Sequence, residues 1–178
     1  FMKTCINSEI GKLKGVIIHQ PGSEVENMTP QNAERALYSD ILNLSIALEE
    51  YAEFRGVLEK ITRVFEVKDL LQEIIKNEQI KIKLLEEVCR NEHIENESSH
   101  LADLPADKLT QHLIEGKVLE QNNLTNYLNE ERFLLRPLHN LFFTRDAAMG
   151  MNNYMLIGRM ANQVRERESI IAYAIFNH

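Results

Sequence analysis

The 178-residue chain is poor in several features that mark particular protein classes. Its two cysteines, Cys5 and Cys89, are far apart and form no Cys-x-x-Cys pair, which argues against a disulfide scaffold and favours a reduced, cytoplasmic protein. No apolar run is long enough to span a membrane, and no basic stretch precedes an apolar signal core. Basic residues are outnumbered, since 20 Lys and Arg face 27 Asp and Glu, giving a net charge of −7. We therefore expect neither a membrane nor a nucleic acid as partner, because nucleic-acid binding needs a basic surface.

The chain does have the composition of a globular domain, with 44% apolar and 26% charged residues. Residues 15–19 form a short β-branched run that ends before Pro21-Gly22, which predicts a strand and a turn. Thr29, followed by proline, is typical of a helix N-cap and predicts a short helix through about Leu37.

A longer helix and a second strand follow. Asp40 is a candidate N-cap for this helix, and the alternation of apolar and polar residues over 61–67 predicts the strand. The apolar positions at helical spacing are Leu44, Leu48, Tyr51 and Leu58.

Residues 69–132 are rich in Leu, Ile, Glu, Lys and Gln and predict several short amphipathic helices. The polar stretch 91–99 predicts a loop between two groups of them. The first apolar stripe is Leu71, Ile74, Ile75, Ile82, Leu85 and Val88, and the second is Leu109, Leu113 and Val118.

Strand signals return near the carboxyl end. Residues 141–144 predict a buried strand, Asn152-Asn153 a turn and residues 154–157 another strand. Asn162 can cap a final helix. The outline is an α/β protein with a first unit at 1–67, a helical block at 68–135 and a second unit at 136–178. The two outer units could be copies of one β/α unit, although no clear repeat supports this.

Two charged motifs could carry chemistry. Arg145-Asp146 follows the apolar run, either as an ordinary exposed ion pair or as a carboxylate at the mouth of a site. A carboxylate can accept two parallel N–H bonds from a guanidinium. Arg165 and Arg167 fall near the start of the final helix, where cations oppose the helix dipole. Either the neighbouring glutamates compensate them, or a ligand carboxylate does.

These motifs resemble those of arginine deiminases. Residues 12–22 are similar to the first strand and turn of that family, and residues 40–42 to the segment that follows. Residues 140–146 are similar to its Asn-Leu-x-Phe-Thr-Arg-Asp motif, and residues 165–168 lie at the family's distance from it. Three positions depart from the usual pattern: Gln20, His139 and Ala147.

The resemblance implies a pentein-type α/β propeller, of which this chain would hold about two ββαβ units plus an inserted helical block. It implies hydrolysis of L-arginine to L-citrulline and ammonia through a cysteine intermediate, with no metal and no cofactor. Asp146 would bind the guanidinium, Asn140 and Arg165 the α-carboxylate, and Phe143 the aliphatic stem.

The resemblance also implies that the nucleophilic cysteine, the catalytic histidine and the second carboxylate lie beyond His178. We therefore expect no catalytic residue in this chain, no activity from it alone, and self-association into a homo-oligomer through its open faces. Cys5 and Cys89 are expected to be structural. His93, His100 and His112 are expected to be solvated, and His19 is either structural or near the site.

Two alternatives stay open. The enzyme could be a deiminase or amidinotransferase acting on another guanidino compound, although Arg165 favours a substrate with an α-carboxylate. Otherwise the chain could be a non-catalytic, helix-rich interaction protein that binds through residues 70–130.

Overall fold

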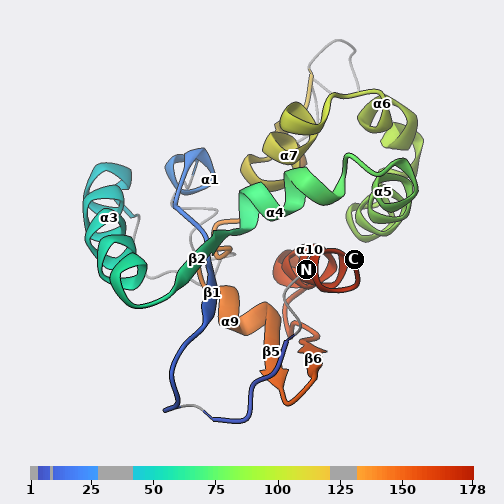
Figure 1. Ribbon diagram of the computed structural model, residues 1–178. Coiled ribbons are helices and arrows are strands. Elements are labelled where there is room, and N and C mark those ends of the chain that lie inside the picture. The colour runs from blue at the N-terminus through green and yellow to red at the C-terminus, as the bar shows by residue number, and fades with distance from the viewer. Residues whose placement is uncertain (1–3, 9, 28–41, 121–131) are drawn as a thin grey trace.

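The computed structural model describes residues 4–8, 10–27, 42–120 and 132–178 (Figure 1). Within these ranges the chain is mixed α/β, with three separate two-stranded sheets. The predicted helix at 29–37 and its cap lie outside the described residues, as does Asp40. No helix within the described ranges is both long and apolar enough to cross a membrane.

The first unit is a βαβ arrangement. Strand β1 (Gly15–Ile18) pairs in parallel with β2 (Arg63–Glu66), and the connection between them includes α1 (Ser23–Glu26) and α3 (Leu44–Ile61). A parallel pair needs such a long crossover, because the chain must return to the same end of the sheet. The strand predicted at 61–67 is real but shorter, since its first residue ends α3 and its last begins the next helix.

The N-cap observed for α3 is Asn43. Its side-chain oxygen accepts hydrogen bonds from the backbone N–H groups of Ser45 at 3.0 Å and Ile46 at 3.4 Å. These contacts satisfy two of the N–H groups that a helix start leaves without partners. Asn77 caps the second helix of the block in the same way.

The predicted helical block is present and consists of α4 (Val67–Ile74), α5 (Glu78–Glu92), α6 (Ser98–Ala102) and α7 (Ala106–Glu115). The loop predicted at 91–99 is largely wrong. Its first two residues belong to α5, Glu95–Glu97 form a 3-10 turn, and Ser98 begins α6. A polar stretch does not distinguish a loop from exposed helical turns, because both have the same polarity.

A small antiparallel pair that the sequence did not predict follows the block. It joins β3 (Lys117–Val118) to β4 (Phe133–Leu135). Val118 therefore lies in a strand, half-exposed, and not on a helical stripe. Gly116 allows the chain to leave α7, since its φ is +88° and a Cβ would lie 2.8 Å from the Leu135 carbonyl oxygen.

The buried strand predicted at 141–144 is also wrong. These residues form turns that lead into the short helix α9 (Thr144–Ala147). The Phe143 N–H donates to the Asn140 carbonyl at 2.9 Å, and the Asp146 N–H donates to the Phe143 carbonyl at 3.0 Å. Local bonds thus occupy the backbone groups that a strand would offer to a neighbour.

A hairpin lies near the carboxyl end, and its turn and second strand are as predicted, whereas its first strand was not predicted. Strands β5 (Ala148–Met151) and β6 (Tyr154–Ile157) pair antiparallel around the Asn152-Asn153 turn, where Asn152 has a φ of +53°. The 3-10 turn η2 (Gln163–Arg165) then leads into α10 (Glu166–Phe176). Asn162 caps this start as expected, because its side chain accepts from the Val164 N–H at 3.0 Å.

The core lies between the helical block and α10, which packs against both α4 and α5 (Figure 1). Most residues of the predicted stripes are buried there, but Ile82 is 45% exposed. By contrast, α3 has no buried residue. The core cluster comprises Val67, Leu71, Ile74, Ile75, Leu84, Leu85, Val88, Cys89, Leu101, Leu109, Leu113, Ile114, Leu135, Leu138, Leu141, Ile171 and Ala174.

Candidate functional site

The candidate site centres on Arg165, which lies at the junction of η2 and α10. Its Nη1 donates to Asp146 Oδ2 at 2.9 Å. Its Nε and Nη2 donate to the two carboxylate oxygens of Glu168 at 3.0 and 2.8 Å. One guanidinium therefore joins two carboxylates, using the fork geometry that makes arginine suited to bidentate pairing.

The two carboxylates differ in environment. The Glu168 side chain is 2% exposed, whereas that of Asp146 is 50% exposed. Burial raises the pKa of Glu168, and the hydrogen bonds from Arg165 offset only part of that rise. The same hydrogen bonds raise the pKa of Arg165. Glu168 is thus the fixed anchor of the arginine, and Asp146 is its partner at the solvent side.

Asp146, Phe143 and Asn140 lie along one continuous turn and helix start, linked by the backbone hydrogen bonds described above. Asn140 is buried, whereas Phe143 is 46% exposed and packs against the ring of Phe142 at a centroid distance of 4.3 Å. Of the four predicted site residues, the structure brings Arg165 and Asp146 into direct contact.

Two contacts fix α9, which carries Asp146. The Thr144 hydroxyl donates to the Ile17 carbonyl of β1 at 3.0 Å. Gly158, at the end of β6, lies so close that a Cβ there would sit 2.8 Å from the Asp146 carbonyl oxygen. The site thus rests on both the first strand and the last hairpin.

Comparison with known proteins decides the family. The family model described as arginine deiminase matches residues 34–178, which is most of the chain. The chain belongs to the arginine deiminase family. The arginine deiminase of Borrelia garinii subsp. bavariensis is 32% identical over 97% of this chain, and that of Oenococcus oeni is 29% identical over the same share. The Staphylococcus aureus arginine deiminase is 32% identical over 97% of the chain.

The chain spans about half the length of these relatives, since the aligned region covers 46% of the first and 45% of the other two. Membership of the arginine deiminase family agrees with the motifs at both ends of the chain. The site residues predicted from those motifs stay predictions.

A second buried polar cluster was not predicted from the sequence, although its member His19 lies in the first of the motifs described above. Glu24 accepts from the Gly22 N–H at 2.7 Å and contacts His19 Nε2 at 3.2 Å. His139 Nδ1 donates to the Glu24 carbonyl. Burial lowers the pKa of His139, and this bond offsets only part of that effect. The cluster joins the first turn to the segment that carries Asn140. The sequence feature that could have indicated it is His139, which departs from the usual family pattern.

Glu66 forms a further polar centre at the end of β2. Its carboxylate accepts from the Tyr51 hydroxyl at 2.5 Å, from Arg55 Nη1 at 3.0 Å and from the Gln20 N–H at 3.1 Å. Burial and the neighbouring Glu66 raise the pKa of Tyr51. The sequence did not predict this centre, because its members are distant in the chain: Gln20 and Glu66 are 46 positions apart.

The cysteines show no catalytic setting. Cys5 is exposed and unpaired, and Cys89 is buried in α5, where burial raises the pKa of its thiol. A thiolate nucleophile needs the opposite shift. Of the histidines expected to be solvated, His93 and His100 are exposed and His112 is partly buried. Among the described residues, no group of three or more His, Cys, Asp or Glu side chains could hold a metal ion.

Proposed function

We propose that this chain is the arginine-binding half of an enzyme that hydrolyses L-arginine to L-citrulline and ammonia. Family membership supports this, together with the contact between Arg165 and Asp146. The reaction runs through a covalent cysteine intermediate. The cysteine, histidine and second carboxylate come from sequence beyond these 178 residues, so the chain alone is inactive.

In this proposal Asp146 binds the substrate guanidinium and Arg165 binds the substrate α-carboxylate. The 2.9 Å contact between their side chains is the pairing that each makes when no substrate is bound. An arginine molecule carries a positive guanidinium and a negative α-carboxylate. On binding, it replaces the ion pair between Arg165 and Asp146 with two ion pairs between protein and ligand. Asp146 can make this exchange readily because it is half-exposed, while Glu168 keeps Arg165 in place.

The two remaining site residues would complete the substrate contacts. Asn140 is buried within the turn and serves the α-carboxylate. Phe143 is half-exposed and covers the aliphatic stem of the substrate. No cofactor or metal takes part in the proposed reaction.

The fold supports a partial propeller. We assign residues 1–67 to a first unit, in which β1, α3 and β2 form the last three elements of a ββαβ repeat. Residues 136–178 form a second unit, in which β5, β6 and α10 are the first three. Residues 68–135 are the inserted helical subdomain.

Homo-oligomer formation and action in the cytoplasm stay predictions. Exposed apolar side chains on α3 and on the β5–β6 hairpin support self-association, among them Phe54, Val57 and Tyr154. Light scattering across a wide concentration range tests this, and a monomer throughout would contradict it.

The deciding experiment measures citrulline release by the complete natural protein. Wild type should convert L-arginine, and Asp146→Asn should reduce kcat/KM at least about a hundredfold, because the charge partner of the guanidinium is lost. Arg165→Ala should raise KM for arginine. Equal loss on arginine and on agmatine, which lacks the carboxylate, would contradict the role given to Arg165. Conversion of another guanidino compound in place of arginine would favour the deiminase or amidinotransferase alternative.

A further inference from the structure

The side chain of Arg167 is completely buried, two residues beyond Arg165. Its Nη2 donates to the Arg136 carbonyl, and its Nη1 lies 3.3 Å from Glu92 Oε1. Within the described residues its Nε and Nη1 have no hydrogen-bond acceptor. A buried guanidinium without a counter-charge is strongly unfavourable, and Glu92 is the carboxylate with which Arg167 forms an ion pair.

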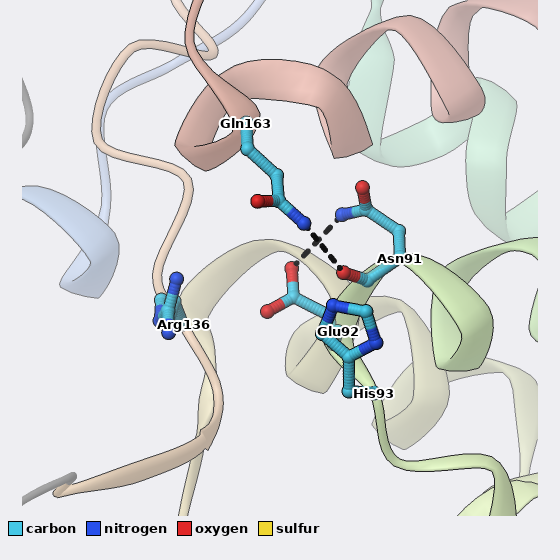
Figure 2. A pocket seen from close by; sticks show the side chains of 5 residues that line it. All are labelled: Asn91, Glu92, His93, Arg136 and Gln163. Carbon is cyan, nitrogen blue, oxygen red and sulfur yellow. Dashed lines mark hydrogen bonds between the residues drawn. The ribbon is translucent and has the colours of Figure 1, made fainter.

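Glu92 is the last residue of α5, so this ion pair joins the helical block to the start of α10. Figure 2 shows the adjoining pocket, of about 80 Å³, lined by Asn91, Glu92, His93, Arg136 and Gln163. Across it the Gln163 side-chain amide donates to the Asn91 carbonyl at 3.4 Å. Both η2 and the first turn of α10 therefore contact the carboxyl end of α5.

The order Arg165-Glu166-Arg167-Glu168 divides these contacts between two sides of the helix start. Residues two apart on a helix point in roughly opposite directions. Arg165 turns to Asp146, and Arg167 turns to Glu92. Glu166 accepts from the Met160 N–H at 3.1 Å and ties the preceding loop to the same turn.

We propose that the Arg167–Glu92 ion pair is a positioning contact through which the helical block holds the start of α10 and thereby sets the place of Arg165. This inference rests on the proposed arginine-binding role of Arg165. In this proposal the helical block contributes to substrate binding indirectly, although it supplies no residue to the predicted site.

The pair can act in this way because its two ends lie on α5 and α10, which are far apart in the sequence. α10 follows a short 3-10 turn, which by itself fixes the direction of the chain weakly. A buried charge pair accepts few alternative geometries, since any displacement leaves an uncompensated charge. Loss of the Glu92 charge should therefore shift or loosen the turn that carries Arg165.

The test uses the complete enzyme with Glu92→Gln, which keeps the shape of the side chain and removes its charge. We expect KM for arginine to rise about tenfold with kcat within about twofold of wild type, because a displaced group weakens substrate binding. Hydrogen exchange of amides 163–170 should accelerate, while that of α7 should not change. Glu86→Gln, at an exposed position of the same helix, is the matched control and should match wild type in every measurement.

An unchanged KM with unchanged exchange at 163–170 would overturn the proposal. A parallel fall of kcat and melting temperature without a rise in KM would also overturn it, because the contact would then serve stability alone. If Glu92→Gln does not fold, Arg167→Lys decides by the same criteria, since it keeps the charge and loses the planar fork. An inactive wild type would refute the proposed function, and the exchange experiment would still decide whether the pair holds the helix start.

Discussion

The helical block and α3 lie in the same chain but are stabilised in opposite ways. The block shares a continuous buried core with α10, whereas the 18-residue α3 buries no residue. Apolar side chains on α3, such as Ile46, Phe54, Val57 and Ile61, are more than half exposed. Polar contacts at Glu66 join α3 to β2. Helix content is therefore a poor guide to where the stability of this chain resides.

The largest effect should come from truncating a core side chain. Leu85→Ala removes a fully buried leucine and should lower the free energy of unfolding by about 2–5 kcal/mol, through lost burial and a cavity. The matched change on α3, Ile46→Ala, should cost less than about 0.5 kcal/mol. Urea unfolding followed by circular dichroism measures both. Equal losses would mean that α3 is packed as tightly as the block.

Removal of the Glu66 carboxylate should have the next largest effect. Glu66→Ala leaves the Tyr51 hydroxyl, Arg55 and the Gln20 N–H without their common acceptor, at a cost of about 1–3 kcal/mol. Tyr51→Phe removes only one of the three bonds and should cost about 1 kcal/mol. Denaturant titration of each variant gives both changes in the free energy of unfolding. A neutral Glu66→Ala would show that these contacts do not hold α3.

The two asparagine caps provide a more sensitive test. Asn77→Ala should lower the free energy of unfolding by about 1 kcal/mol, because α5 belongs to the core. Asn43→Ala should have a smaller global effect, since α3 can fray without disturbing that core. Hydrogen exchange at the first turn of each helix separates local from global loss. Identical global costs would show that α3 and the core unfold together.

The smallest effect concerns pH. The folded-state pKa of His139 lies below its ordinary value, so the unfolded chain takes up a proton first as the pH falls. This histidine therefore contributes stability above pH 6.5, and the contribution is lost as the pH falls from about 6.5 toward the lowered pKa. His139→Asn should flatten that part of the stability profile relative to wild type. A parallel profile for the two proteins would contradict the inferred shift.

Prediction from the sequence succeeded where local chemistry decides the structure. The β-branched run of β1, the Asn152-Asn153 turn and the cap at Asn162 all have short-range causes, and each is present. It failed at 141–144, where an apolar run looks like a strand but Leu141 enters the core from a turn. The pairing of Arg165 with Asp146, and the burial of Glu168 and Arg167, depend on tertiary contacts that no spacing of residues could give.

The placement of α10 also has a consequence for folding rate. The helices of the block lie close together in sequence, so their mutual contacts close short loops. By contrast, residues 93–165 separate α10 from α5. Contacts between distant segments form slowly, because loop-closure entropy must be lost before they become favourable. During synthesis α4 to α7 leave the ribosome before α10 exists. The apolar side of the block therefore stays exposed until α10 has been synthesised. In that interval the nascent chain is open to chaperone binding and to aggregation.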